Sequence, residues 1–186
     1  ATDYAGAVEW CKDAALAADR AYAVSAANTH LTTLARHDPG FGATMRQFDI
    51  NFPDGMPLVW AMNRKLPDAR KLRDRVYGPT LMLETMMATA GDPRFRHFLL
   101  GGKESTLQKL QAKLPERIPG LHLAGVYSPP FGQWSAAENA NIFDRIRASK
   151  ANLVWVGLGC PKQESWIAAH KSQLPPAVYF GIGAAF

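Results

Sequence analysis

The segment LVWVGLGCPKQESWI, residues Leu153–Ile167, gives the plainest indication of architecture in this chain. Its first six residues form an almost continuous apolar run, which is typical of a strand buried on both faces of a parallel sheet. The run gives way to Gly157 and Gly159, and Pro161 suits the first turn of a helix that we expect to continue to Gln173. The segment therefore predicts a strand, a glycine turn and a helix in succession.

The same alternation of short apolar runs and amphipathic stretches continues along the rest of the chain. Besides the strand at 153–158, we expect strands at residues 21–26, 48–52, 95–100, 121–127 and 177–182. The other expected helices cover residues 4–18, 29–36, 57–65, 80–90, 105–114 and 136–148. This order indicates an α/β protein: a Rossmann-like parallel sheet with helices on both faces, formed by residues 1–186 as a single domain. In such sheets, ligands bind beyond the carboxyl ends of the strands.

The composition agrees with one folded domain and limits the kinds of partner that the protein would bind. The chain has 186 residues, of which 47% are hydrophobic and 20% charged, and its formal net charge is +5. Such a mild basic excess is typical of a well-solvated surface, but two clusters of basic residues are denser than that. They are Arg64, Lys65, Arg70, Lys71, Arg73 and Arg75 in one segment, and Arg94, Arg96 and His97 in another. Such clusters attract phosphates, nucleic acid or anionic lipid headgroups, and composition does not choose among these.

The cysteine count and the hydropathy pattern favour a cytoplasmic protein. Cys11 and Cys160 are the only cysteines and lie far apart, so they predict neither a disulfide framework nor a metal site. The chain shows no signal peptide and no apolar run long enough to span a bilayer. We therefore expect a reducing, cytoplasmic setting.

Two glycine turns are candidates for phosphate binding. In the first, Gly157 and Gly159 precede a helix whose first turn carries Lys162, Gln163 and Glu164. Glycines let the backbone approach a ligand, and the free N–H groups of a helix N-terminus attract an anion. Lys162 and Gln163 would reach a diphosphate or a sugar hydroxyl, whereas Glu164 would serve equally to complement the helix dipole. By glycine spacing alone, an ordinary turn and a phosphate site fit this segment equally well.

The second glycine turn is Gly101-Gly102-Lys103, which again follows a strand and precedes a helix. In isolation it predicts only a tight turn, but two such turns in one parallel sheet favour a nucleotide crevice. Neither turn matches the dinucleotide-binding fingerprint or the P-loop, whose Lys-Ser/Thr step is missing.

Polar residues close two other predicted strands. Asp54, in Pro53-Asp54-Gly55, is by default a turn former, but a carboxylate at the ligand edge would also act as general base on an acceptor hydroxyl. Asn28 would cap the following helix, and His30 is one helical residue among others. The sequence contains no Ser-His-Asp set, no His/Cys cluster with metal-ligand spacing and no Asp-x-Asp pair.

These residues belong to a series of short motifs that together resemble one family. In order, the motifs are Asn28-Thr29-His30, Pro53-Asp54-Gly55, Arg75-Val76-Tyr77-Gly78, Phe98-Leu99-Leu100-Gly101-Gly102, Tyr127-Ser128-Pro129-Pro130-Phe131, Gly157–Glu164 and Gly181–Phe186. Over almost the whole chain, they are similar to those of the WecG/TagA/CpsF glycosyltransferases, also called glycosyltransferase family 26. The Gly-x-Gly-x-Pro-Lys-Gln-Glu block is quite specific to that family.

The resemblance implies an inverting transfer that uses neither a metal nor a cofactor. A hexose of the N-acetylmannosamine type would move from a UDP-sugar to a sugar on undecaprenyl diphosphate, at the inner face of the plasma membrane, where the enzyme is peripheral. The products would feed wall teichoic acid, enterobacterial common antigen, capsule or exopolysaccharide. The expected partners are thus the donor, the polyprenyl-linked acceptor and the membrane surface, not nucleic acid, and the family also forms homo-oligomers.

The resemblance also assigns roles to particular residues. Asp54 corresponds to the family's proposed general base, Gln163 to a donor contact, and Asn28 to the lining of the same pocket. An inverting transfer needs one base opposite the leaving diphosphate, so a single carboxylate suffices. Without a metal, helix N-termini and a cation would stabilise the leaving UDP; Arg75 is our candidate cation, with a surface salt bridge as its alternative role. We extend the donor site to Thr29, Gly101, Gly102, Gly157, Gly159, Pro161, Lys162 and Glu164, and assign Tyr127 and Pro130 to the acceptor site.

Two departures from the family pattern bear on activity. The family often has threonine two residues before the asparagine, where this chain has Ala26, which leaves the donor sugar open. Family members usually continue past the position of Phe186 with an aspartate and a basic amphipathic tail, and we expect a chain that ends there to bind UDP-sugar weakly and turn over slowly. Three alternatives remain: transfer of glucose or another hexose in exopolysaccharide assembly, a non-catalytic nucleotide-sugar binding module, and a nicotinamide-dependent oxidoreductase, whose glycine fingerprint and acidic ribose residue are absent.

Overall fold

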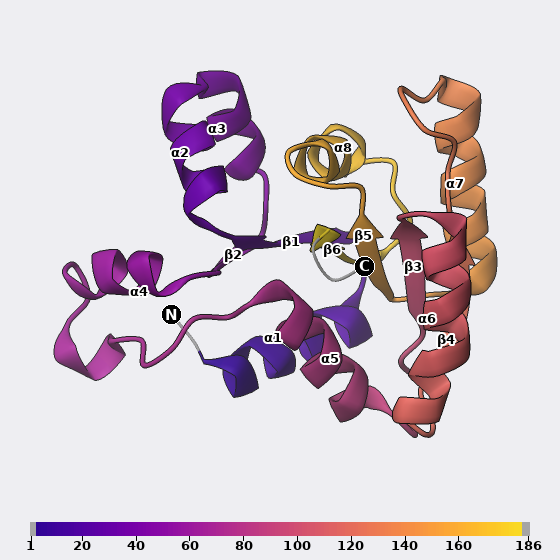
Figure 1. Cartoon of the computed structure of the whole chain (residues 1–186), viewed down its shortest axis with the longest axis horizontal. Helices are drawn as coiled ribbons and strands as arrows, with labels where there is room; N and C mark the ends of the chain where they lie inside the picture. Colours follow the sequence, from indigo (N-terminus) through magenta and orange to yellow (C-terminus); the bar gives the residue numbers. More distant parts are fainter. Residues whose placement is uncertain (1–2, 184–186) are drawn as a thin grey trace.

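Six parallel strands form one sheet in the order β2-β1-β6-β5-β3-β4 in the computed structural model, which describes residues 3–183 (Figure 1). Every neighbouring pair is parallel. The strands are β1 (Ala21–Ala27), β2 (Ile50–Pro53), β3 (His97–Gly101), β4 (Leu123–Tyr127), β5 (Leu153–Gly157) and β6 (Ala177–Gly181). The predicted Rossmann-like α/β sheet is confirmed, and the six predicted strands are all present.

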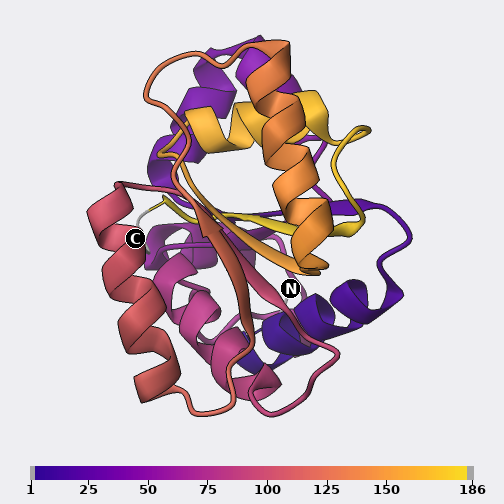
Figure 2. The ribbon, with the colours of Figure 1, turned by 90° about the vertical axis from the view of Figure 1, so that its right-hand side faces the viewer.

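Helices cover both faces of the sheet, as predicted. Figure 2 shows α7 and α8 on one side and α1, α5 and α6 on the other, and Figure 1 places α2 and α3 on the side of α8. None of the helices within residues 3–183 is long and apolar enough to cross a membrane. The helices are α1 (Tyr4–Ala17), α2 (Thr29–His37), α3 (Pro39–Met45), α4 (Met56–Asn63), the short 3-10 helix η1 (Asp68–Arg70), α5 (Gly78–Thr89), α6 (Glu104–Arg117), α7 (Ala136–Ser149) and α8 (Lys162–His170).

The core lies in two layers because alternate side chains of the central strands point to opposite faces. In β5, Val154 and Val156 pack under α7 and α8, while Leu153 and Trp155 pack against the layer of α1, α5 and α6. The Trp155 ring stacks on that of Phe180 in β6, with 4.0 Å between their centroids. Burial on both faces explains why β5 is almost continuously apolar.

The structure corrects the sequence predictions mainly at helix boundaries. Pro161 is the N-cap of α8 and not a residue of its first turn, and the helix ends at His170, short of Gln173. The helix α3 was not predicted, because its Pro39-Gly40 start and second glycine favour a loop; it forms because Asp38 caps it, accepting hydrogen bonds from the N–H groups of Gly40 and Phe41.

The parallel arrangement brings the carboxyl ends of all six strands to one edge of the sheet. Ala27 of β1 pairs with Pro53 of β2, and Gly181 of β6 is in register with Val156 of β5. The residues that follow these strand ends therefore meet along this edge, although they are far apart in the sequence.

Candidate functional site

At the carboxyl edge, the ends of β1, β2 and β6 surround a small pocket of about 170 Å³, which we call the Asp54 pocket. The first residues of α5 and the start of α8 complete its wall. Asn28 directly follows β1 and Asp54 directly follows β2, so the pairing of these strands brings both residues to the pocket. The lining residues are Ala26, Asn28, Leu31, Asp54, Gly78, Pro79, Gly159, Cys160, Gln163, Glu164, Gly181, Ile182 and Gly183.

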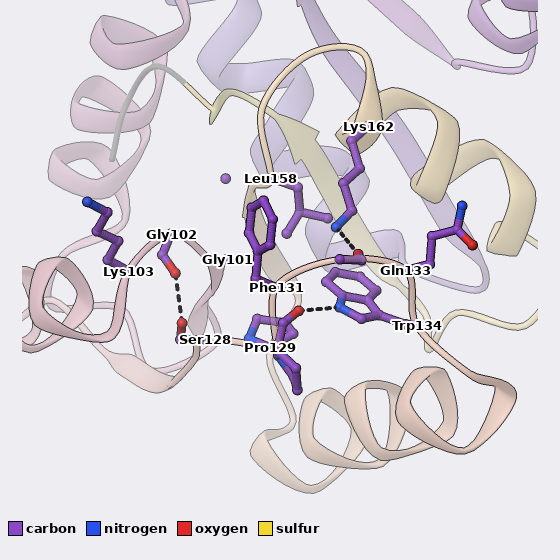
Figure 3. A pocket seen from close by; sticks show the side chains of 13 residues that line it. Gly101, Gly102, Lys103, Ser128, Pro129, Phe131, Gln133, Trp134, Leu158 and Lys162 are labelled. Atoms are coloured by element: carbon purple, nitrogen blue, oxygen red, sulfur yellow. Dashed lines mark hydrogen bonds between the residues drawn. The ribbon is translucent and has the colours of Figure 1, made fainter.

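A larger pocket of about 830 Å³ lies at the ends of β3, β4 and β5, and we call it the Lys162 pocket (Figure 3). The loop that follows β4, residues 128–134, forms much of its wall. The lining residues are Gly101, Gly102, Lys103, Ser128, Pro129, Pro130, Phe131, Gly132, Gln133, Trp134, Gly157, Leu158 and Lys162.

The first turn of α8 stands between the two pockets. Lys162 lines the larger one, whereas Gln163 and Glu164 line the Asp54 pocket, because successive side chains of a helix point about 100° apart. The turn begins where the N–H of Gln163 donates to the carbonyl of Gly159, 2.9 Å away. Gly159 has a φ of +80°, and a Cβ added to it would meet no atom within 4 Å, so the space beside its backbone is open.

A buried network fixes Gln163 within the Asp54 pocket. Its Oε1 accepts a hydrogen bond from the N–H of Gly183 at 3.0 Å, and its Nε2 donates to Oε1 of Glu164 at 2.9 Å. The side chain is thereby held at both ends of its amide. A Cβ at Gly183 would lie 2.5 Å from this Oε1, so the close approach requires glycine there.

Glu164 is fully buried, and its second carboxylate oxygen, Oε2, has no hydrogen-bond partner. Burial raises the pKa of this carboxyl above its usual range, and the hydrogen bond from Gln163 opposes that shift only in part. Glu164 contributes to the wall of the Asp54 pocket, but this oxygen is itself buried, which favours the uncharged form of the carboxyl.

The Asp54 carboxyl is half-buried, and its backbone is fixed to the sheet because its N–H donates to the carbonyl of Ala27 at 2.9 Å. Partial burial raises its pKa, while the N–H of Gly78 and the positive charge of Arg75 act to lower it. The net effect is a rise in pKa. A carboxylate of this kind is a better proton acceptor than one in water, which suits a general base.

The loop 128–134 is held against α8 and β3. In Figure 3, the Lys162 ammonium donates to the carbonyl of Gly132 at 2.7 Å, and it lies 4.4 Å from the centroid of the Trp134 ring. The Trp134 indole N–H donates to the carbonyl of Pro130, and the hydroxyl of Ser128 to that of Gly102, each at 2.7 Å. These contacts leave one wall of the pocket cationic and aromatic.

The structure divides the residues predicted for the site into three groups. Asn28, Asp54, Gly159, Gln163 and Glu164 line the Asp54 pocket. Gly101, Gly102, Pro130, Gly157 and Lys162 line the Lys162 pocket. Thr29, Arg75, Tyr127 and Pro161 line neither of them.

The third group lies outside the pockets for local reasons. Thr29 is exposed as the first residue of α2, which Asn28 caps by accepting from the N–H of Leu31 at 3.0 Å. Arg75 is exposed beside the Tyr77 ring, where its charge still acts on Asp54. The Tyr127 hydroxyl donates to Glu138 on α7 at 2.6 Å, which turns the ring toward that helix.

Several lining residues were missed by the sequence analysis. Cys160 and Pro79 line the Asp54 pocket, and Phe131 and Trp134 line the other. Phe131 is fully exposed, at 107% of its reference area. Two aromatic residues in a loop rich in proline and glycine, just after a predicted strand, are the signal that would have indicated the last two.

Within residues 3–183, no group of three or more His, Cys, Asp or Glu side chains is arranged to hold a metal ion. The polar side chains that line the two pockets include Lys103 and Lys162 in the larger one, and Asn28, the half-buried Asp54 and the Gln163–Glu164 pair in the smaller one. These groups are able to bind an anion, accept one proton and form hydrogen bonds with hydroxyl groups.

A comparison with known protein families agrees with this arrangement. The family model described as Glycosyl transferase WecG/TagA/CpsF family matches residues 1–186, the whole chain. The chain therefore belongs to the WecG/TagA/CpsF glycosyltransferase family and is a glycosyltransferase of cell-surface polysaccharide synthesis.

Proposed function

We propose that the protein transfers a hexose from a UDP-sugar to a sugar on a polyprenyl diphosphate, with inversion at the anomeric carbon. The observation that carries the proposal is the position of α8, whose first turn presents Lys162 to one pocket and Gln163 and Glu164 to the pocket that holds Asp54. A nucleotide sugar is divided in the same way, because it joins an anionic nucleoside diphosphate to a neutral hexose.

The UDP moiety would occupy the Lys162 pocket. Lys162 supplies a positive charge beside the N-terminus of α8, and Lys103 lines the opposite wall. Gly101 and Gly102 both have positive φ values, +98° and +79°, in a turn that lets a ligand approach the backbone. The fully exposed ring of Phe131 offers a face on which a planar pyrimidine stacks. These features favour a nucleoside diphosphate over an isolated phosphate.

The hexose would occupy the Asp54 pocket, which is too small for a nucleotide. The second N–H of the Gln163 amide would donate a hydrogen bond to its hydroxyl or acetamido groups. Ala26 lines this pocket with a methyl group where related glycosyltransferases often have threonine. One hydroxyl contact to the donor is therefore absent, and this difference leaves the choice between N-acetylmannosamine and another hexose to experiment.

The reaction would run as a single displacement. The acceptor hydroxyl oxygen attacks the anomeric carbon from the face opposite the diphosphate, and the bond between that carbon and the β-phosphate oxygen breaks. The bonding electrons leave with UDP, and the acceptor proton passes to the Asp54 carboxylate. Lys162 and the N-terminus of α8 stabilise the negative charge that develops on UDP.

We further infer that the acceptor is a membrane lipid and that the protein works peripherally, at the inner face of the plasma membrane. The support is family membership, which makes the protein a glycosyltransferase of cell-surface polysaccharide synthesis. The acceptor to which the protein transfers the sugar will identify its biosynthetic pathway.

The proposal is tested by Asp54→Asn, which keeps the size of the side chain and removes its basicity. We expect the rate of UDP release with a lipid-diphosphate sugar acceptor to fall by about 10²–10⁴-fold, the usual contribution of a general base. UDP affinity, measured by calorimetry, should stay within about twofold, because Asp54 lies outside the pocket proposed for UDP.

Asp13→Asn is the matched control, since Asp13 is an exposed aspartate on α1. It should leave both measurements unchanged. The assay is run with UDP-glucose, UDP-N-acetylglucosamine and UDP-N-acetylmannosamine, and the donor that gives acceptor-dependent UDP release identifies the sugar. A non-catalytic binding module predicts instead that Asp54→Asn changes nothing, and that result would refute the enzyme proposal.

A further inference from the structure

The basic charge of the protein is concentrated in one segment, residues 60–75. It holds six of the basic residues against Asp68 and Asp74, a net charge of +4, while the whole chain carries +5. The remaining 170 residues are thus nearly neutral. All six basic side chains are exposed. They are Arg64, Lys65, Arg70, Lys71, Arg73 and Arg75.

The same segment exposes two large apolar side chains. Trp60 is 62% exposed and Met62 is 38% exposed, both on the last turns of α4. Trp is favoured at membrane–water interfaces, where its ring contacts the acyl boundary and its N–H contacts the headgroups. Lys and Arg side chains next to it reach outward to lipid phosphates. We favour an anionic lipid surface over nucleic acid as the occupant, because an exposed tryptophan beside basic side chains suits the headgroup level and the proposed acceptor is a lipid.

The segment is folded and does not need a partner to order it. The amide of Asn63 makes two hydrogen bonds with the backbone of Leu72, donating to its carbonyl at 2.9 Å and accepting from its N–H at 2.8 Å. Leu72 is itself buried, so the end of the loop is fixed to the body of the protein. The basic residues between Asn63 and Leu72 are therefore presented on a closed and fixed loop.

The segment lies beside the proposed catalytic carboxylate. Figure 1 shows α4 and the chain that follows it extending beyond the edge strand β2, away from the other helices. The helix α4 begins two residues after Asp54, and the chain returns where the N–H of Val76 donates to the carbonyl of Pro53 at 2.9 Å. A flat surface that contacts residues 60–75 would therefore lie close to the Asp54 pocket.

We propose that residues 60–75 form a docking surface for a membrane that carries anionic lipid headgroups. Binding to the membrane would take place whether or not the protein is catalytically active. Its role rests on the proposed function, because the contact would hold the Asp54 pocket at the headgroup level, where a sugar on a polyprenyl diphosphate is found. Attraction to the surface comes from the basic residues, and insertion of Trp60 adds apolar contact.

The experiment measures sedimentation with vesicles of phosphatidylcholine alone and of phosphatidylcholine mixed equally with phosphatidylglycerol. The test variant is the triple change Arg70→Gln, Lys71→Gln and Arg73→Gln, which leaves Arg75 in place. The matched control, Lys109→Gln, Lys113→Gln and Arg117→Gln, removes the same charge from exposed positions on α6. We expect the test variant to lose about tenfold or more in affinity for the anionic vesicles, and the control to lose about twofold at most.

Trp60→Ser supplies a second and independent measurement. It should weaken binding to the anionic vesicles, and the tryptophan quenching that brominated lipids cause in the wild type should decrease with it. None of these variants touches either pocket, so UDP affinity and transfer to a water-soluble acceptor should persist. Failure of the docking proposal is thereby distinguishable from failure of the transferase proposal, which Asp54→Asn tests.

Four outcomes would overturn the docking proposal. One is equal loss of vesicle binding in the test variant and the α6 control, and another is equal wild-type binding to neutral and anionic vesicles. A third is a test variant that loses binding to duplex DNA or RNA but keeps its vesicle binding, which assigns the surface to nucleic acid. The fourth is a wild-type oligomer that Trp60→Ser converts to a monomer, with vesicle binding unchanged, which assigns it to a second copy of the chain.

Discussion

Glu164 illustrates how burial sets the chemistry of a single residue. Its carboxyl is fully buried, only Oε1 has a partner, and burial raises its pKa. The folded protein therefore holds this proton more tightly than the unfolded chain does. The stability that results is present at low pH and is lost as the pH rises through the pKa of the folded state.

The variant Glu164→Gln tests this prediction, because its side chain stays neutral at every pH. The Tm of the variant minus that of the wild type should increase as the pH rises from the acid range toward neutral, because only the wild type loses stability there; in a domain of this size each 1 kcal/mol corresponds to about 2–4 °C. Thermal melts followed by circular dichroism give the difference. Glu116→Gln, at an exposed position on α6, should show no such trend, and a Glu164→Gln difference that is flat with pH would contradict the argument.

Sequence motifs identified the residues of this turn but not their division between pockets. Lys162, Gln163 and Glu164 were all assigned to donor binding. Successive side chains of a helix point about 100° apart, so the pocket that each one faces depends on how α8 packs on the sheet, which the sequence pattern does not record.

Among the secondary-structure elements, the ends of β3 and β5 approach each other closely. Gly101 ends β3 with a φ of +98°, and a Cβ there would lie 2.6 Å from the carbonyl oxygen of Gly157 at the end of β5. Gly91 has a similar φ of +79°, but a Cβ there would meet nothing within 4 Å. The two glycines separate the effect of backbone conformation from the effect of close packing.

Gly101→Ala should therefore destabilise the protein more than Gly91→Ala. We expect Gly91→Ala to cost about 1 kcal/mol from backbone strain alone, and Gly101→Ala to cost about 2–4 kcal/mol because the strand ends must also separate. Urea unfolding measures both. Only Gly101→Ala should also weaken UDP binding, since Gly101 lines the Lys162 pocket. Equal losses of stability in the two variants would mean that the close approach of the strand ends does not contribute to the free energy of unfolding.

Most elements were predictable because apolar periodicity is a local property of the chain. Local patterns did not predict the order of the strands, although the resemblance to the family implied that Asp54, Asn28 and Gln163 share one pocket. Asp54 follows β2, and Gln163 follows β5; they line one pocket because β1 and β6 lie between those strands and end at the same edge. Strand order arises from long-range packing, which no local pattern records. The assignment of Tyr127 to the acceptor site stays a prediction; its hydroxyl donates a hydrogen bond to Glu138 on α7.

At the scale of the whole molecule, His97 joins the sheet to one helical layer. It lies at the start of β3, 1% exposed, between Trp155 of β5 and Thr89 of α5. The Trp155 indole donates to Nδ1 at 3.0 Å, so Nδ1 is an acceptor and the proton is on Nε2, which contacts the Thr89 hydroxyl at 2.9 Å. The Thr89 hydroxyl in turn donates to the carbonyl of Thr85.

This network requires a neutral imidazole, because a second proton on Nδ1 would face the indole N–H. Burial, with a smaller contribution from His122, lowers the pKa of His97 to about 3. In the unfolded chain, the pKa would be close to the ordinary value of about 6.5. Between these two values the unfolded chain binds a proton that the folded protein does not, so the network loses stability as the pH falls from about 6.5 toward 3.

The acid sensitivity of the fold should therefore depend on His97. In the wild type this residue should lower the free energy of unfolding by up to about 1.4 kcal/mol for each pH unit below about 6.5. His97→Asn keeps an acceptor for the Trp155 indole but does not titrate, so it should be less stable near neutral pH and show a shallower decline toward acid. Urea unfolding at a series of pH values measures both slopes. His37→Asn, at an exposed position on α2, should keep the wild-type slope, and equal slopes for His97→Asn and the wild type would show that the acid response originates elsewhere.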